Sequence, residues 1–323
     1  MADMTPPVGA GEFLEGAGWG GAAVTPLAGD ASFRRYFRVT LGGGSAVLMD
    51  APPPHEDPRP FLHVGGWLGE RGFGAPRIIA SDLSRGLVLL EDFGDRRMRE
   101  IADAEPDRLL GLYEAAVDVL VDLHKHPAGP LEPYDRAALH REAALLTEWY
   151  CPAVGLRVDA EGYTTAWDRV FEHALAAEPV TVLRDYHAEN LMLVGDRLGL
   201  LDFQDALAGH PAYDLVSLLQ DARRDVDADV EEAMLSRYRG ATGAGDAFLR
   251  AYHVLGAQRN AKIVGIFTRL WKRDGKPRYP ALCPRVWAYL ERDLAQLALE
   301  PVARWFGDNI PPEMRGDPML LSA

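Results

Sequence analysis

Residues 182–205, VLRDYHAENLMLVGDRLGLLDFQD, decide the fold. An apolar strand is predicted at 180–183, and Asp185 follows it in a loop, with Asn190 five residues later. A second apolar strand, at 198–201, leads directly into Asp202, twelve residues after Asn190. The pattern predicts a hairpin that presents Asn190 and Asp202 side by side.

The spacing of these three polar residues suits phosphoryl transfer. That reaction needs a carboxylate to accept a proton from the attacking hydroxyl, and oxygen ligands for Mg²⁺ on the nucleotide phosphates. Asp185 fits the first role, and Asn190 and Asp202 fit the second. The alternative is a polar turn between two strands. The full pattern, D-x-H-x-x-N, then a strand and D-F-Q, disfavours that alternative.

The chain before this stretch is predicted to form a mostly antiparallel sheet with one helix. The run FRRYFRVT at 33–40 alternates apolar and polar residues, as a half-buried strand does. The segment 51–60 contains five prolines and is predicted to be a loop. The other strands are expected at 24–27, 46–50, 78–80 and 86–90, and the helix at 61–72.

The rest of the chain shows helical patterns. They lie at 106–126, 138–150 and 162–177, and then from 215 onward. The sequence therefore predicts an α+β protein with a small β-rich lobe, residues 1–91, and a larger helical lobe, residues 92–323. A ligand is expected in a cleft between such lobes.

Composition excludes several classes of protein. With 34 Lys and Arg against 48 Asp and Glu, the net charge is −14, which disfavours binding to nucleic acid or to an anionic membrane. Cys151 and Cys283 are the only cysteines, too few for a disulfide framework or a Cys-rich zinc site. No signal peptide or membrane-spanning run is visible. A soluble, cytoplasmic protein without an obligate protein partner is expected.

The stretch at 182–205 resembles the catalytic loop of the aminoglycoside phosphotransferase family, whose pattern is H-G-D-x-H-x-x-N, a strand and I-D-[FW]. Within that family the sequence is most similar to the bacterial anomeric kinases of N-acetylmuramate and N-acetylglucosamine. The block DFQDALAGHPAYDL, beginning at Asp202, is the specific one. The matching segments are 29–38, 47–54, 90–95, 184–191, 201–220 and 267–276.

The resemblance implies a protein-kinase-like bilobal fold, with the active site between the lobes, and the cofactors ATP and Mg²⁺. Asp185 would be the catalytic base, and Asn190 and Asp202 the metal ligands. Asp214 would hold the catalytic loop, and it is also expected to cap a helix at 215–224. The segment 89–93, with Glu91 and Phe93, would be the hinge that pairs with adenine. The loop over the phosphates would comprise Gly29, Asp30, Ala31 and Ser32.

The sequence departs from the family pattern at two places. Leu183, Arg184 and Asp185 stand for H-G-D. Met49 stands where kinases have the lysine that binds the phosphates, and the first 124 residues contain no lysine. We expect Arg34 or Arg35 to replace that lysine, because arginine binds phosphate as a bidentate donor.

The acceptor would lie beside Asp185. Nearby in sequence, His187 could orient the substrate or the loop. The carboxylate of Asp205 could bind two sugar hydroxyls, or it could cap the turn before Gly209. Glu189 is a third polar candidate. In the cationic run RLWKRDGK at 269–276, Arg269 and Arg273 could line the sugar pocket or neutralise a lactyl carboxylate, or the run could be a solvated helix end.

The resemblance thus implies an ATP-dependent sugar kinase that acts on the anomeric C1 hydroxyl of N-acetylmuramate, N-acetylglucosamine or both, in peptidoglycan recycling. The alternatives are a kinase of another small hydroxyl compound, such as an aminoglycoside, choline or a different sugar, and a nucleotide-binding pseudokinase. Retention of Asp185, Asn190 and Asp202 together argues against the pseudokinase.

Overall fold

The computed structural model describes residues 5–27 and 34–322, and its chain divides into two units. The first unit contains residues 1–106 and 189–206, and the second contains 107–188 and 207–323. The division therefore differs from the single boundary after residue 91 that the sequence predicted. The segment 189–206 joins the first unit because its hairpin bonds to that unit's backbone, as described below.

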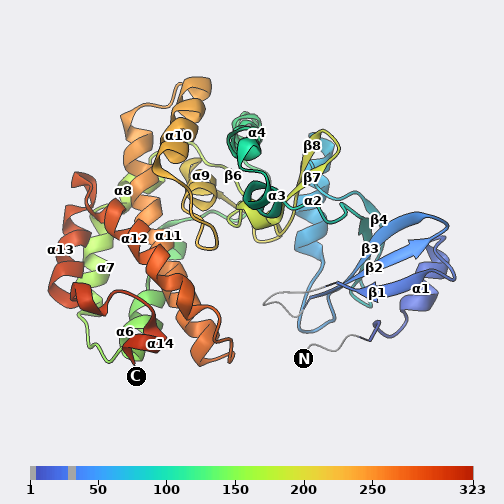
Figure 1. Ribbon diagram of the computed structural model, residues 1–323, viewed down its shortest axis with the longest axis horizontal. Coiled ribbons are helices and arrows are strands. Elements are labelled where there is room, and N and C mark those ends of the chain that lie inside the picture. Colours follow the sequence, from blue (N-terminus) through green and yellow to red (C-terminus); the bar gives the residue numbers. More distant parts are fainter. Residues whose placement is uncertain (1–4, 28–33, 323) are drawn as a thin grey trace. The chain divides into compact units, whose positions relative to one another are not determined.

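The first unit contains the expected antiparallel sheet (Figure 1). Its strand order is β1-β2-β3-β5-β4. A two-residue turn at Gly42 and Gly43 joins the second and third strands, and it places Arg35 opposite Asp50. The strands are β1 (Ala23–Pro26), β2 (Arg35–Leu41), β3 (Gly44–Asp50), β4 (Ile78–Asp82) and β5 (Leu87–Glu91).

The two faces of this sheet differ. On one face, Phe37 and Val39 of β2 pack with apolar residues of β3 and β5 and with Leu14 of helix α1 (Ala10–Gly16). On the other face, Tyr36 lies opposite Met49 in the strand register, and Met49 is fully buried. Because side chains alternate along a strand, Arg35 of β2 lies on the face of Phe37, and Arg38 lies on the face of Tyr36.

Helix α2 (Arg59–Glu70) follows the proline-rich loop and belongs to the same unit. Its buried face includes Phe61, whose ring stacks on Phe203 at 4.8 Å between ring centroids. Gly65 lies so close to the Phe203 ring that an added Cβ would come within 3.3 Å of it. The helix is thereby fixed to the residue that directly follows Asp202.

The predicted hairpin is present as β7 (Leu191–Val194) and β8 (Arg197–Leu200). Two backbone bonds tie it to the first unit: Leu200 N–H donates to Gly74 O at 2.8 Å, and Leu193 N–H donates to Arg96 O at 2.8 Å. Helix α3 (Met98–Ala104) lies beside β7 (Figure 1).

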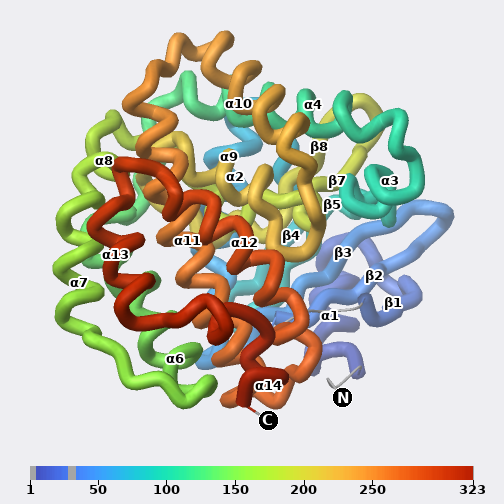
Figure 2. Tube along the Cα trace, turned by 60° about the vertical axis from the view of Figure 1, so that its left-hand side comes forward, coloured from blue at the N-terminus to red at the C-terminus, as the bar shows by residue number. Residues whose placement is uncertain are grey.

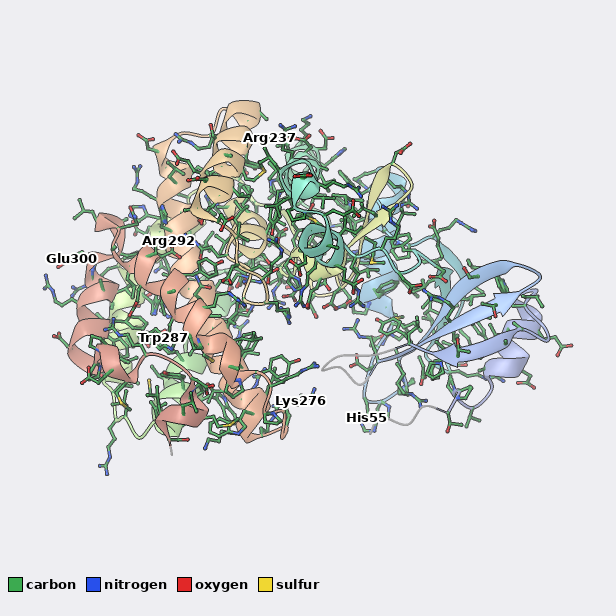
Figure 3. All side chains as sticks on the ribbon, viewed as in Figure 1. His55, Arg237, Lys276, Trp287, Arg292 and Glu300 are labelled. Atoms are coloured by element: carbon green, nitrogen blue, oxygen red, sulfur yellow. The ribbon has the colours of Figure 1, made fainter. Side chains whose placement is uncertain are left out.

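The second unit is mainly helical. Its longest helix is α11 (Asp246–Lys272), and α12 (Cys283–Leu294) lies beside it in Figures 1 and 2. Trp287 of α12, labelled in Figure 3, is buried and packs against Tyr150 at 5.3 Å between ring centroids. The other helices are α4 (Leu109–Leu123), α5 (Arg136–Ala143), α6 (Cys151–Ala153), α7 (Ala160–Asp168), α8 (Phe171–Leu175), α9 (Ala212–Leu219), α10 (Ala228–Thr242), α13 (Glu300–Asn309) and α14 (Pro318–Leu321).

Several predicted elements differ in the structure. The expected strands at 180–183 and 198–201 belong to different pairs: β6 (Val180–Val182) pairs with β9 (Leu207–Gly209), and β8 pairs with β7. The helix predicted at 138–150 is α5 followed by a π-helical turn, Leu146–Tyr150. No helix in the described ranges is long and apolar enough to cross a membrane.

Candidate active site

Asp214 positions the loop that carries Asp185. Its fully buried carboxylate accepts hydrogen bonds from Leu183 N at 2.6 Å and from Arg184 N at 2.8 Å. Burial raises the pKa of Asp214 to about 7, against the lowering effect of these two bonds. The expected N-cap role is wrong, because α9 begins at Ala212 and the Asp214 side chain bonds to the loop. The expected loop-holding role agrees with these bonds.

Arg184, one of the residues in that loop, has a φ of 71°. It occupies the position of the glycine in H-G-D, and glycine adopts this left-handed conformation without strain, whereas arginine does not. The arginine side chain pairs with Glu142 and lies over the ring of Tyr134, 5.8 Å from its centroid. These contacts hold the guanidinium beside the loop and oppose the backbone strain.

Asp185 lies among positive charges of the second unit. Burial would raise the pKa of its carboxyl, but Lys262, His187 and Arg259 bring the pKa below its usual value. A carboxylate that accepts a proton has to be ionised first. Burial lowers the pKa of His187 and favours its neutral form, so Lys262 and Arg259 are the charges that favour an ionised Asp185. Lys262 makes the largest of the lowering contributions.

A substitution of Lys262 therefore tests how the surrounding charge affects the pKa of Asp185. Its Nζ lies 2.9 Å from Glu142 Oε1 and 3.2 Å from the Tyr213 hydroxyl, which fixes it on the wall of α11. We expect Lys262→Met to raise the pKa of Asp185, because removing a nearby positive charge disfavours the carboxylate. The acid limb of the pH profile of kcat/KM should move to higher pH.

Lys262→Arg is the matched control, because it keeps the charge and should keep the acid limb close to that of the parent. Thermal melts of both variants separate this effect from a loss of folding. An acid limb that stays in place in the Lys262→Met variant would show that the charge of Lys262 does not act on the reacting group.

Asn190 and Asp202 lie side by side at the open end of the hairpin. Leu201 N–H donates to Asn190 O at 2.9 Å, and Leu191 pairs with Leu200 in the strand register. Asp202 has a φ of 59°, and its side chain is 48% exposed. The first unit thus presents one carboxylate and one amide oxygen together.

This pair of oxygen donors fits Mg²⁺. Proteins usually bind Mg²⁺ through one or two carboxylates, with substrate phosphates and water completing the shell. Within residues 5–27 and 34–322, no three His, Cys, Asp or Glu side chains are grouped to hold a metal ion by themselves. A site that shares its ion with a nucleotide therefore suits Asn190 and Asp202 better than a closed protein cage.

The structure separates the two arginines that sequence analysis left as alternatives. Arg34 Nη2 lies 3.9 Å from Asp202 Oδ1, on the sheet face of Tyr36 and Met49. Arg35 points to the opposite face, where its Nε donates to Asp50 Oδ2 at 2.8 Å. The predicted phosphate loop, Gly29, Asp30, Ala31 and Ser32, lies outside the described residues.

The segment after β5 is held by its side chains. Glu91 Oε1 accepts from Arg197 at 2.8 Å, and Phe93 lies under the Arg197 guanidinium, 5.2 Å from its carbon. Arg38 bonds to Asp92 at 2.8 Å and to Asp95 at 2.9 Å. The side chains of Glu91 and Phe93 therefore both contact Arg197 of the hairpin, and the Glu91 N–H donates to Arg77 O at 2.9 Å.

The structure does not bring the five predicted acceptor residues into one unit. Glu189 and Asp205 belong to the first unit, where Glu189 pairs with Arg99 and Asp205 is exposed. His187 belongs to the second unit and is buried, with Arg223 Nη1 at 3.3 Å from its Nε2.

The two arginines at the end of α11 also belong to the second unit. Arg273 is exposed and pairs with Asp274 at 2.7 Å, which agrees with a solvated helix end. Arg269 is half-buried, and burial, together with Arg273, lowers its pKa. Arg269 is therefore less accessible to solvent than Arg273.

Sequence reasoning missed Lys262, Glu142 and Glu56. The contact between Lys262 and Glu142 joins residues 120 positions apart, and no local pattern reports such a distance. One signal was nevertheless present, because Lys262 is one of only four lysines in an arginine-rich chain and lies in an otherwise apolar run.

Comparison with known proteins shows the family of the chain. The model of the phosphotransferase enzyme family matches residues 23–252. An N-acetylmuramate/N-acetylglucosamine kinase from Pseudomonas aeruginosa is 43% identical over 302 residues, with 88% of each chain covered. A protein of the same name from Caulobacter vibrioides is 37% identical, with 94% of this chain and 96% of the relative covered.

Solved structures show the fold. A choline/ethanolamine kinase family protein from Mesorhizobium loti aligns with a TM-score of 0.60 at 16% identity, covering 98% of this chain and 96% of that one. The aminoglycoside phosphotransferase APH(2'')-IIa, solved with streptomycin and ATP, aligns with a TM-score of 0.61 at 14% identity, covering 92% and 99%. The expected protein-kinase-like fold is confirmed.

Proposed function

Because the chain belongs to the phosphotransferase enzyme family, we propose that it is a sugar kinase that transfers the γ-phosphoryl group of ATP to the anomeric C1 hydroxyl of N-acetylmuramate and N-acetylglucosamine. The observation that carries the proposal is the identity to the Pseudomonas kinase, 43% with 88% of both chains covered. The resemblance noted in the sequence points to the same acceptors.

In the proposed reaction Asp185 accepts the proton of the sugar hydroxyl as the new O–P bond forms. The positive charges of Lys262 and Arg259 favour this role, because they hold the carboxyl ionised. The bonds from Leu183 N and Arg184 N to Asp214 fix the loop, so Asp185 needs little reorganisation when the acceptor arrives.

Asn190 and Asp202 would hold Mg²⁺ through their side-chain oxygens. The metal ion would supply charge neutralisation at the phosphates of ATP. Gly29, Asp30, Ala31 and Ser32 are proposed to donate backbone N–H groups to the same phosphates. The backbone around Glu91 and Phe93 is proposed to pair with adenine.

The charges around Asp185 also bear on the acceptor. Lys262, Arg259 and Arg184 of the second unit all act on its carboxyl. Glu142 pairs with both Lys262 and Arg184, so these charges alone do not decide between a cationic and an anionic acceptor. The identity to the Pseudomonas kinase favours the acetamido sugars over aminoglycosides and choline, whose kinases resemble this chain at 12–18% identity.

We propose Asp205 and Arg269 as the first acceptor contacts to examine, for sugar hydroxyls and for a lactyl carboxylate respectively. His187 is proposed to orient the loop from its buried position, since its imidazole lies beside Arg223. Glu189 and Arg273 are further candidates, and each forms an ion pair, with Arg99 and Asp274 respectively.

The product, a sugar 1-phosphate, is the form needed to make a nucleotide-activated sugar. We therefore propose a role in peptidoglycan recycling, in the cytoplasm where ATP is present. The proposal requires no protein partner and no nucleic acid.

The test is an assay of ADP release with N-acetylmuramate, N-acetylglucosamine, glucose, kanamycin and choline as separate acceptors. We expect turnover with the two acetamido sugars and little with the others. Turnover with kanamycin or choline alone would replace the proposed function with the alternative acceptor. Tight binding of Mg·ADP without turnover on any acceptor would indicate a pseudokinase.

A further inference from the structure

We propose that Arg34 is the side chain that binds the nucleotide phosphates, and that Glu56 positions it. This inference rests on the proposed function, because it concerns the ATP of that reaction. Residues 1–124 contain no lysine that could bind the phosphates, and the inference assigns that role to Arg34, just before β2.

The β3 strand itself offers no cation. Met49 is fully buried and pairs in register with Tyr36 on one side and Val88 on the other. A buried thioether cannot neutralise a phosphate, so the charge has to come from another element. The three arginines at Arg34, Arg35 and Arg38 are the nearest source in the sequence.

Two of these arginines, Arg35 and Arg38, form close pairs with carboxylates other than Asp202. Arg35 bonds to Asp50 through Nε at 2.8 Å and Nη2 at 2.6 Å, and Asp50 is only 2% exposed. Arg38 bonds to Asp92 and Asp95 beyond the end of β5, at 2.8 and 2.9 Å. Both form close, charge-assisted pairs that a phosphate would have to break.

Arg34 differs in the kind of contact that it makes to acidic residues. Its Nη2 lies 3.9 Å from Asp202 Oδ1, and its Nε lies 3.8 Å from Glu56 Oε2. At these distances the guanidinium is attracted to both carboxylates, and both contacts are longer than those of Arg35 and Arg38. Arg34 is therefore held near the candidate metal ligand, so that an anion bound beside Asp202 would also lie beside its guanidinium.

The position beside Asp202 defines that anion. When Asp202 serves as a metal ligand, the anionic groups that share the metal ion are the nucleotide phosphates. A guanidinium next to Asp202 is then next to those phosphates, and its planar donors suit two phosphate oxygens at once. Before the nucleotide binds, the carboxylate of Asp202 partly balances the positive charge of Arg34.

Glu56 has the properties of a positioning residue. It lies in the proline-rich loop that precedes α2, where its own N–H donates to Pro52 O at 3.1 Å. Its side chain is 22% exposed, and its carboxylate lies near the oppositely charged guanidinium of Arg34. The loop therefore holds the carboxylate at a fixed place, and the carboxylate restrains the long arginine side chain.

The experiment compares Arg34→Gln with Arg35→Gln, two adjacent substitutions, one just before β2 and one at its first residue. The dissociation constants of Mg·ADP and of adenosine, which has no phosphate, are measured by calorimetry, together with the melting temperature of each variant. Arg34→Gln should weaken Mg·ADP binding by about tenfold or more and leave adenosine binding unchanged.

The melting temperatures should show the reverse order. Arg34→Gln leaves carboxylates that are 22% and 48% exposed, so water can solvate them and stability should change little. Arg35→Gln leaves the buried Asp50 without its cation and should lower the melting temperature by several degrees, with Mg·ADP affinity close to that of the parent. Arg34→Lys should restore part of the lost affinity.

Glu56→Gln should weaken Mg·ADP binding less than Arg34→Gln does, and it should have no further effect once Arg34 is replaced. The proposal is overturned if Arg34→Gln binds Mg·ADP as tightly as the parent, or loses adenosine and Mg·ADP affinity equally. Continued sugar phosphorylation in that case would leave the proposed function standing. A parent chain that binds no nucleotide would instead overturn the proposed function itself.

Discussion

Asp185→Asn is expected to lower kcat by about 10²–10⁴-fold, the usual contribution of a positioned general base. The amide keeps the size of the side chain but cannot accept the proton of the sugar hydroxyl. Affinity for Mg·ADP should stay near the parent value, because the proposed nucleotide contacts lie on other residues. The measurement is steady-state ADP release together with calorimetry of Mg·ADP.

Asp196→Asn is the matched control for this variant. Asp196 lies in the exposed two-residue turn of the hairpin between β7 and β8, away from the residues of the proposed mechanism. Its replacement removes one carboxylate of the same kind and should leave kcat unchanged. A kcat of Asp185→Asn within about threefold of the parent, well inside the range expected for a lost base, would remove Asp185 from the reaction.

Asp202→Ala is expected to abolish turnover, down to the background of the assay. The substitution removes the only carboxylate of the proposed Mg²⁺ pair, and Asn190 alone supplies a neutral oxygen. Because the Asp202 side chain is 48% exposed, its loss should leave the melting temperature of the unliganded chain near the parent value. Titration of activity with Mg²⁺ checks the result.

The same variant makes a second prediction about metal dependence. If Asp202 is a metal ligand, raising the Mg²⁺ concentration should recover some activity, since a weakened site fills at higher ion concentration. Activity like that of the parent at ordinary Mg²⁺ would show that the metal ion, if bound, is held by other groups.

Local patterns predicted much of the fold. The alternation of FRRYFRVT predicted the strand β2, and the apolar run before Asp202 predicted the strand β8. The two-residue turn at Gly42 and Gly43 also determines the register between β2 and β3, because it places Arg35 opposite Asp50. The alternation along 33–40 already predicted that Arg35 and Arg34 point to opposite faces, but it left open which of the two binds phosphate.

Other features depend on contacts that local sequence does not show. The carboxylate of Asp214 was expected to cap a helix, but the preceding Pro211 and Ala212 already start α9, which turns the side chain to the loop of Asp185. The unit boundaries differ for the same reason. The hairpin at 191–200 follows the loop of Asp185 in sequence, yet its hydrogen bonds are to Gly74 and Arg96.

The candidate site was predicted unevenly. Spacing and resemblance predicted roles for Asp185, Asn190 and Asp202, because the motif is short and its residues are close in sequence. The surroundings of Asp185 were not, because Glu142, Arg259 and Lys262 come from helices α5 and α11, far along the chain. Burial and charge around a reactive carboxylate result from tertiary packing, which spacing alone does not report.

In the proposed reaction, phosphate is transferred to the anomeric hydroxyl of an acetamido sugar. Two-dimensional ¹H–³¹P NMR of the product formed from N-acetylmuramate, Mg²⁺ and ATP reports the position of the phosphate directly. We expect a phosphorus resonance that correlates with the anomeric proton of the sugar. A phosphorus resonance that correlates with the protons at C6, or the absence of any sugar phosphate while ATP remains intact, would contradict it.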